Sequence, residues 1–195
     1  MDEWGGIMND SDNWDIEDRV FKHFKLKEDS ENFSEIYVTG YEEYYLENRE
    51  ILKKANIEEW IDKIVKPKEW YWPTNFSEMT SEEVHQFYED RFQANKETTY
   101  ITIGFIYLKY QLDIPVNIKK EIINSIDIEI NNTENTKEKH KENFRPDHDN
   151  HIEYFSPYYD KHIEHLNFFK KCIKKEDGEG LINIGSILPK RSLYE

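Results

Sequence analysis

The sequence predicts a mainly α-helical protein: a single-domain helical bundle with a central helical hairpin and long ordered loops. Three observations favour this fold class. Apolar residues recur at helical spacing in several segments, capping residues precede those segments, and the longest apolar run is too long for a typical strand. The 195 residues suit one domain of ordinary size. Its 5 Trp, 13 Tyr and 11 Phe supply large areas for burial where aliphatic residues are scarce.

Three helices are predicted in the first third of the chain. The first spans residues 11–24, with acidic groups in its first turn, and the second spans residues 41–54. Asn56 then caps a shorter helix that Pro67 ends. The apolar positions that carry the helical spacing are Ile16, Val20, Phe21, Phe24, Tyr41, Tyr44, Tyr45, Ile51, Leu52, Ile57, Trp60, Ile61 and Ile64.

The run over residues 68–75 is rich in rings and lies close to two prolines, so we expect an ordered loop that packs Trp70 and Trp72 against the body of the protein. A capping box follows, in which Thr80 and Glu83 exchange hydrogen bonds between side chain and backbone. This pattern predicts the start of a further amphipathic helix.

Residues 100–112 contain many apolar residues and few charges, and their β-branched members leave a buried helix or a strand open. The length of the run favours the helix. After a break at Asp113-Ile-Pro115, the apolar spacing over residues 116–128 predicts a second helix. Together these segments form the expected central hairpin.

The chain is expected to divide into a helical core over residues 1–130, a polar linker or loop over residues 131–144, and a C-terminal helix and tail over residues 145–195 that pack on the same domain. Ser156-Pro157 has the residues of a helix start, and glycines at 178 and 180 would stop that helix. Residues 181–188 are a short strand or an extended segment.

The charge balance narrows the function classes. The chain has 41 acidic and 26 basic residues, a formal net charge of −15 and a pI of about 4.9. This argues against binding nucleic acid or an anionic membrane through a general basic surface. The start of the chain lacks the order of a signal peptide, no apolar stretch suits a membrane span, and the lone Cys172 cannot form an internal disulfide. We expect a cytoplasmic protein, of undetermined oligomeric state.

The charge is also unevenly placed, since residues 1–18 hold seven acids and no base whereas five lysines lie between residues 161 and 175, after Pro157. One interpretation is intramolecular, because acids at a helix start and lysines at a helix end both complement the helix dipole. The other is a docking face for a basic protein partner, in which acids steer the encounter and rings anchor it. The candidate partner-binding residues are Trp4, Asp10, Asp12, Trp14, Asp15, Glu17, Asp18, Tyr41, Tyr44 and Tyr45.

The N-terminal residues resemble a family of uncharacterised bacterial proteins. The shared pattern is Trp4-Gly5, five further residues, then Ser11-Asp12-Asn13 and Asp15. Some members also carry a hydrophobic helix, a short break and an amphipathic helix, which residues 100–127 resemble. Small acidic single-domain families of this kind are similar to the immunity partners of bacterial toxins, so the resemblance implies an inhibitor.

Five of the seven histidines lie between His140 and His165. His162 and His165 would share a helix face, and His148 or His151 could complete a zinc or mixed metal site. The alternative is a polar loop and two histidines that flank an apolar helix face, because no fixed metal motif is present. We assign no cofactor.

Arg145 and His151 also resemble the arginine and histidine pair of HEPN-type ribonucleases, in which the two residues stabilise phosphate charge and transfer protons. Here Pro146 follows Arg145 directly, where that family usually has a polar helical residue. No phosphate-binding loop or nucleophile motif occurs elsewhere.

These observations favour an acidic, non-enzymatic inhibitor, an immunity protein that occludes the active site of a cognate bacterial toxin. A phage-encoded inhibitor of a bacterial defence nuclease would bind by the same steering through acidic residues and the same anchoring through aromatic rings. The alternatives are a metal-dependent or HEPN-like ribonuclease centred on residues 148–165, and a structural subunit whose acidic face keeps it soluble. We nominate no catalytic residue.

Overall fold

The helices of this protein pack around one central helix. The computed structural model describes residues 11–27, 40–69, 71–142 and 151–176. Within these ranges it has seven α-helices, one short 3₁₀ helix and no strand, which confirms the mainly α fold class. The elements are α1 (Ser11–Phe24), α2 (Gly40–Lys54), α3 (Ile57–Val65), η1 (Phe76–Glu78), α4 (Ser81–Arg91), α5 (Lys96–Lys109), α6 (Val116–Glu142) and α7 (His151–Lys175).

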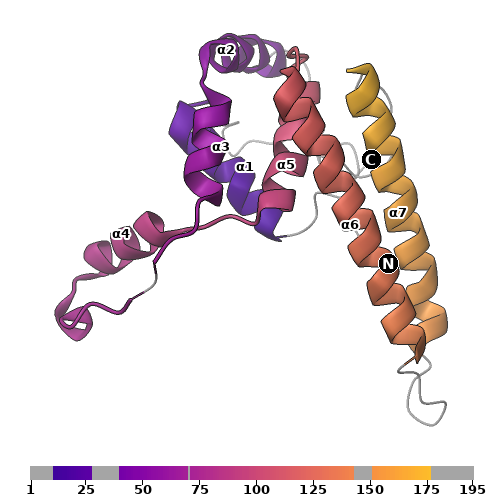
Figure 1. Cartoon of the computed structure of the whole chain (residues 1–195). Helices are drawn as coiled ribbons and strands as arrows, with labels where there is room; N and C mark the ends of the chain where they lie inside the picture. The colour runs from indigo at the N-terminus through magenta and orange to yellow at the C-terminus, as the bar shows by residue number, and fades with distance from the viewer. Residues whose placement is uncertain (1–10, 28–39, 70, 143–150, 177–195) are drawn as a thin grey trace.

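Helix α5 is the centre of the core. Every residue from 99 to 108 is buried, because α5 packs against α1 and α3 on one side and against α6 and α7 on the other (Figure 1). A helix that is apolar all round can exist only in such surroundings. The buried hydroxyls of Thr99 and Thr102 donate to the carbonyls of Asn95 and Thr98, at 2.7 and 2.9 Å, so they leave no unsatisfied donor.

Gly104 brings α5 close to α6 and α7. A Cβ atom at this position would lie 3.0 Å from Cγ2 of Ile122, 3.0 Å from Cζ of Phe169 and 3.1 Å from Cδ1 of Ile173. One residue further on, the ring of Phe105 stacks on that of Phe169 with centroids 3.9 Å apart. The glycine is therefore required for close packing rather than for an unusual backbone conformation.

The predicted hairpin is confirmed, but its second helix is much longer than expected. Residues 131–142 were expected to be part of a polar linker, and they instead form the last turns of α6. Packing against α7 explains the difference: Thr133 is buried, and Lys137 forms an ion pair with Asp160 across the two helices. None of the described helices is both long enough and apolar enough to span a lipid bilayer.

The last helix also differs from its predicted limits. It begins at His151, so Pro157 lies inside α7 rather than at its first position. A proline there removes one backbone hydrogen bond, but the neighbouring turns continue. The helix ends at Lys175, where Glu176 takes a left-handed conformation (φ 56°), before the glycines that were expected to stop it. The expected strand over residues 181–188 lies outside the described residues.

Helix α2 is fixed on top of the bundle by one buried amide. The side chain of Asn48 accepts from the backbone N–H of Lys27 at 2.8 Å and donates to the carbonyl of Lys27 at 3.0 Å. Its neighbour Arg49 donates to the carbonyls of Tyr110 and Gln111, at the C-terminal end of α5. These bonds link α2 to the ends of both α1 and α5.

Two predicted helix starts are confirmed at atomic detail. The Asn56 side chain accepts from the N–H of Glu59 at the start of α3. Thr80 and Glu83 form the reciprocal capping box at the start of α4, with the Thr80 N–H donating to the Glu83 carboxylate at 2.7 Å.

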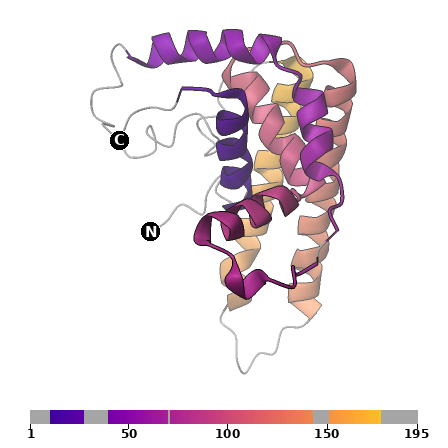
Figure 2. The same cartoon turned by 90° about the vertical axis from the view of Figure 1, so that its left-hand side faces the viewer.

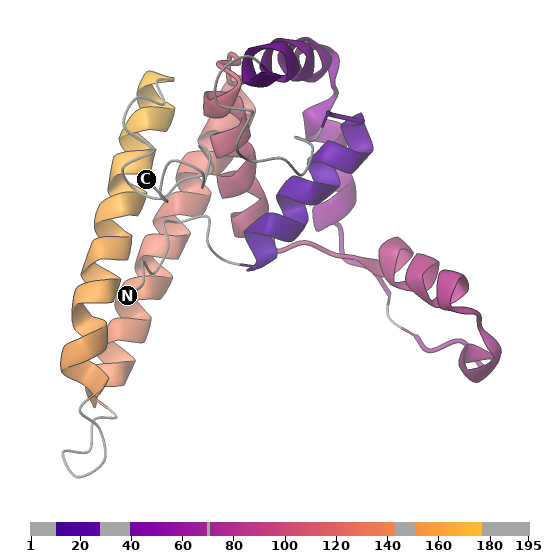
Figure 3. The same cartoon turned by 180° about the vertical axis from the view of Figure 1, so that it is seen from behind.

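Residues 66–92, which we call the arm, project away from the bundle. The arm consists of the loop after α3, η1 and α4, and it lies well to one side of the other helices (Figures 1 and 3). At the base of the arm, the N–H of Ala94 donates to the carbonyl of Ile64 at 2.9 Å. This hydrogen bond joins the segment that leads into the arm to the segment that leads out of it.

We expect Gly104→Ala to destabilise the protein by about 1–2 kcal/mol in urea unfolding. Overpacking against Ile122 and Phe169 outweighs the helix propensity that alanine gains, because both neighbours are fully buried. Ile173→Val removes the Cδ1 atom that the new methyl would meet. The loss of unfolding free energy in the double variant, Gly104→Ala with Ile173→Val, should therefore be smaller than the sum of the losses in the two single variants. Strictly additive losses would contradict this packing argument.

Candidate protein-binding surface

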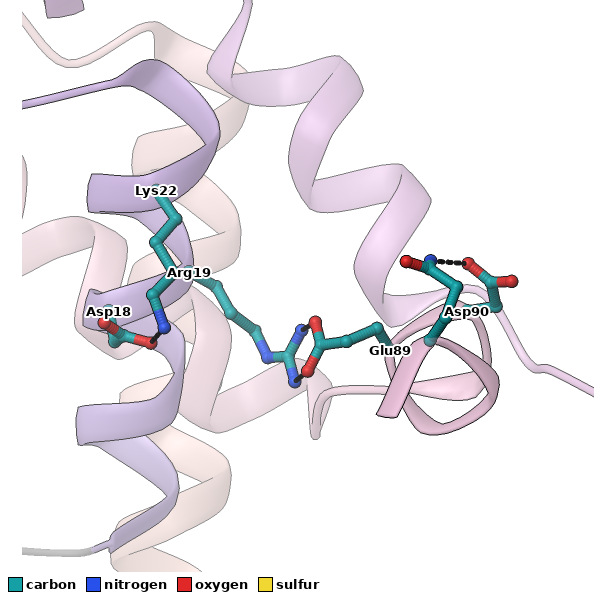
Figure 4. A network of polar contacts seen from close by, with 6 residues as sticks. Asp18, Arg19, Lys22, Glu89 and Asp90 are labelled. Atoms are coloured by element: carbon teal, nitrogen blue, oxygen red, sulfur yellow. Dashed lines mark hydrogen bonds and ion pairs between the residues drawn. The ribbon is translucent and has the colours of Figure 1, made fainter. Parts of the chain in front are cut away.

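The described acids of α1 are partly neutralised by nearby lysines. Asp18 pairs with Lys22 one turn further along the helix at 2.6 Å, and Glu17 lies 3.4 Å from Lys109 of α5 (Figure 4 shows the first pair). Asp15 is exposed and forms no ion pair within the part of the chain that the structure describes. These three carboxylates therefore differ in how much charge they present to a partner.

The late lysines do not neutralise these acids. Lys170 of α7 pairs with Asp127 of α6, and the ion pairs of Glu17 and Asp18 are made by α5 and α1 instead. Among the described residues, no lysine of α7 forms an ion pair with an acid of α1. Lys170 instead contributes to the contact between α6 and α7.

Most of the ring anchors predicted from the sequence cannot be placed. The side chains of Trp4, Asp10, Asp12, Trp14, Tyr41 and Tyr44 lie outside those that the structure describes. Tyr45 is described and is half-buried, with its ring stacked on that of Tyr110 at 5.4 Å between centroids. Burial raises the pKa of Tyr45. One face of this ring thus contributes to packing inside the protein.

The arm carries a second acidic and aromatic surface that the sequence interpretation missed. Residues 69–90 contain six carboxylates, six aromatic residues and neither lysine nor arginine. The signal in the sequence is the absence of lysine and arginine over this stretch. The carboxylates are Glu69, Glu78, Glu82, Glu83, Glu89 and Asp90, and all six are exposed.

The arm folds around a single buried ring. Phe87 is the only fully buried side chain of the described arm residues, and it contacts the rings of Trp72, Phe76 and Tyr88 at centroid distances of 6.1, 5.8 and 5.7 Å. Trp72 also meets Phe76 edge-to-face at 4.7 Å. The arm therefore has an aromatic cluster of its own in place of an aliphatic core.

The outer rings of this cluster face solvent. Tyr71, Trp72 and Tyr88 are 60%, 61% and 42% exposed. The expectation that Trp72 packs against the body is wrong, because most of its surface is exposed and the ring contacts described for it are with Phe76 and Phe87 of the arm. Trp70 lies outside the described residues. We call Tyr71, Trp72 and Tyr88 the arm face. Figure 2 shows the arm from the side on which α4 lies in front of the bundle.

One arginine ties the arm to the bundle. Arg19 of α1 donates to both carboxylate oxygens of Glu89 on α4, at 2.6 and 3.0 Å (Figure 4), and its guanidinium lies 3.5 Å from the centroid of the Phe92 ring. The hydrogen bonds from Arg19 lower the pKa of Glu89. A planar fork and a ring contact together fix orientation better than either would alone.

The histidine cluster is only partly described, and the described part holds no metal centre. His162 lies 3.7 Å from Glu129 of α6, and His165 is half-buried one turn further along α7. Among the described residues, no group of three or more His, Cys, Asp or Glu side chains is arranged to hold a metal ion. His148 and the side chain of His151 lie outside the described set, as does Arg145 of the ribonuclease hypothesis.

No family model, no curated protein and no solved structure matches this chain. The resemblance of its first residues to a bacterial family therefore stays a prediction. The features that bear on function are the acidic residues and exposed rings of the arm.

Arg19→Lys should loosen the arm without unfolding the bundle. Lysine keeps the charge but loses the fork and most of the ring contact, so we expect a local cost of about 1 kcal/mol. Amide hydrogen exchange in α4 should rise about fivefold, while exchange in α5 and α6 stays unchanged. Lys53→Gln, which removes a similar surface pair with Glu50, is the control. Unchanged α4 exchange in Arg19→Lys would contradict the role of this contact.

His165 should make stability depend on pH in the mildly acidic range. Burial, and then the charge of Lys161, lower the pKa of His165 below 6.5. The unfolded chain therefore takes up a proton near pH 6.5 that the folded protein resists, and stability is lost as the pH falls through that value.

The measurement is the free energy of unfolding between pH 7.5 and 5.5. His165→Gln should show a smaller loss than the wild type over this range, whereas His85→Gln, at an exposed position of α4, should match the wild type. Glu89 and Glu176 contribute only at lower pH, because their pKa values lie below 4.5. Identical curves for His165→Gln and wild type would refute the assignment.

Proposed function

We propose that this protein binds a basic protein and inhibits it, as immunity proteins do to bacterial toxins. The observation that carries the proposal is the arm: a projecting element with six exposed carboxylates, no lysine or arginine between residues 69 and 90, and rings turned to solvent. A soluble monomer gains no stability from exposing such rings.

The charges support attraction of a basic partner at long range. The whole chain carries −15, and the exposed Asp15 of α1 adds to the acids of the arm. Summed negative potential of this size accelerates the encounter with a cationic protein, and the acceleration falls with ionic strength. Specificity and lifetime then depend on buried ring contacts rather than on charge.

The shape of the arm supports inhibition by occlusion. An element that projects from a rigid bundle fits a concave surface, and the active sites of enzymes that act on nucleic acid are concave and basic. An acidic projecting arm would compete there with the phosphate backbone of the substrate. This mechanism needs no catalytic residue in the inhibitor.

The test is capture of a partner from bacterial lysate, followed by kinetics with the purified pair. We expect the captured protein to be basic and its activity to be blocked. Asp15→Lys, Glu78→Lys and Glu82→Lys together should lower the association rate by about tenfold or more, because they reverse three exposed charges of the proposed surface.

The matched control reverses three exposed acids elsewhere: Asp62→Lys, Glu134→Lys and Glu164→Lys. Both triple variants have the same net charge, so their comparison separates the surface from the total charge. An equal loss in both would leave only non-specific attraction. An acidic captured partner, or an association rate that does not respond to salt, would overturn the proposal.

A further inference from the structure

The arm face presents three aromatic rings to solvent. Packing around Phe87 accounts for the inner sides of Trp72 and Tyr88. It leaves Tyr71, Trp72 and Tyr88 at 60%, 61% and 42% exposure. The chemistry of an occupant can be inferred from how this region already holds cations.

The rings of this region already bind guanidinium groups. Arg91 of α4 lies 3.8 Å from the centroid of the Phe87 ring and 4.6 Å from that of Tyr71. At the base of the arm, Arg19 lies 3.5 Å from the Phe92 centroid while it donates to Glu89. At the base of the arm, a ring with a carboxylate beside it thus holds the guanidinium of Arg19, and within the arm the rings of Phe87 and Tyr71 hold that of Arg91.

Lysines approach rings less closely in this protein. The ammonium of Lys109 lies 5.5 Å from the Phe21 centroid and 5.6 Å from that of Tyr110, and Lys96 lies 5.7 Å from Tyr100. All three contacts are longer than those of Arg19 and Arg91. Lys96 and Lys109 also pair with carboxylates, those of Glu121 and Glu17, but they stay at the longer distance from a ring. A planar guanidinium can stack directly on a ring while its edge hydrogen-bonds to a carboxylate.

The charges decide against a second copy as the occupant. Residues 69–90 carry six carboxylates and no lysine or arginine, so two arms that met face to face would bring like charges together. A nucleic acid would be repelled for the same reason. The complementary occupant is cationic.

We propose that the arm face is the docking site for an arginine-rich segment of a partner protein. Guanidinium groups of that segment stack on Trp72 and Tyr71, and carboxylates of residues 69–90 neutralise them. This inference rests on the proposed function and makes it more specific, since it names arginine rather than general basicity as what the surface recognises.

The experiment compares an oligo-arginine peptide with an oligo-lysine peptide of equal length, by titration calorimetry against the full chain at physiological ionic strength. We expect the arginine peptide to bind about fivefold or more tightly, which is the effect of one or two ring contacts. Tyr71→Ser and Trp72→Ser should each reduce this preference. Val116→Ser, at a position 86% exposed on α6, should leave it unchanged.

Tyr71→Ser is the safer variant, because Trp72 also contacts Phe87 and its loss could unfold the arm; hydrogen exchange of α4 verifies that the arm is intact. Equal affinity for the two peptides, or an arginine preference that survives both ring variants, would overturn the inference. So would concentration-dependent self-association that Tyr71→Ser abolishes.

The two proposals fail separately. If a captured basic partner binds the ring variants as well as the wild type, the proposed function stands and the arm face is not its docking site. If the chain discriminates arginine from lysine but no basic partner is captured, the inference stands and the proposed function fails.

Discussion

The burial of α5 on all sides is the constraint on which the rest of the structure depends. Hydrophobic residues make up only 37% of the chain, and a large share of them lies in this helix and in the stripes of α1, α3, α6 and α7 that face it. Gly104 allows α6 and α7 to approach closely, and the stacked pair Phe105 and Phe169 fills the space beside it. Because the aliphatic residues are concentrated there, the remaining elements have to be held by other means.

The arm and α2 illustrate those other means. Asn48 holds α2 through a two-way amide contact with the backbone of Lys27, and Arg19 holds α4 through a fork and a ring. The arm is packed around Phe87 by aromatic rings rather than by aliphatic side chains. An element with so few buried contacts has low local stability, so its orientation depends strongly on the one arginine at its base.

Local signals in the sequence were sufficient for most of the fold. The caps at Asn56 and Thr80 depend on residues three apart, so a pattern captures them fully. The extension of α6 over residues 131–142 could not be found in this way, because that stretch has no apolar period and is held by a helix that follows it in the chain. The turns of α7 before Pro157 likewise show that Ser156-Pro157, although it has the residues of a helix start, does not begin this helix.

The surface was harder to predict, because exposure is a property of the whole fold. Tryptophan is highly buried on average, so the sequence alone favours burial of Trp72. Its exposure follows from the position of the arm beside the bundle, which no residue near Trp72 specifies. Acidic residues are dense at the start of α1, but density alone does not show that their charge is available, because Asp18 pairs with Lys22 along the same helix. The stretch over residues 69–90 has neither lysine nor arginine with which to form such local pairs, and Glu89 is the carboxylate of this stretch that the described ion pairs include, through Arg19 of α1. For a surface that binds cations, the absence of neighbouring bases is therefore a better sign than the number of acids, since only unpaired carboxylates retain their charge for a partner.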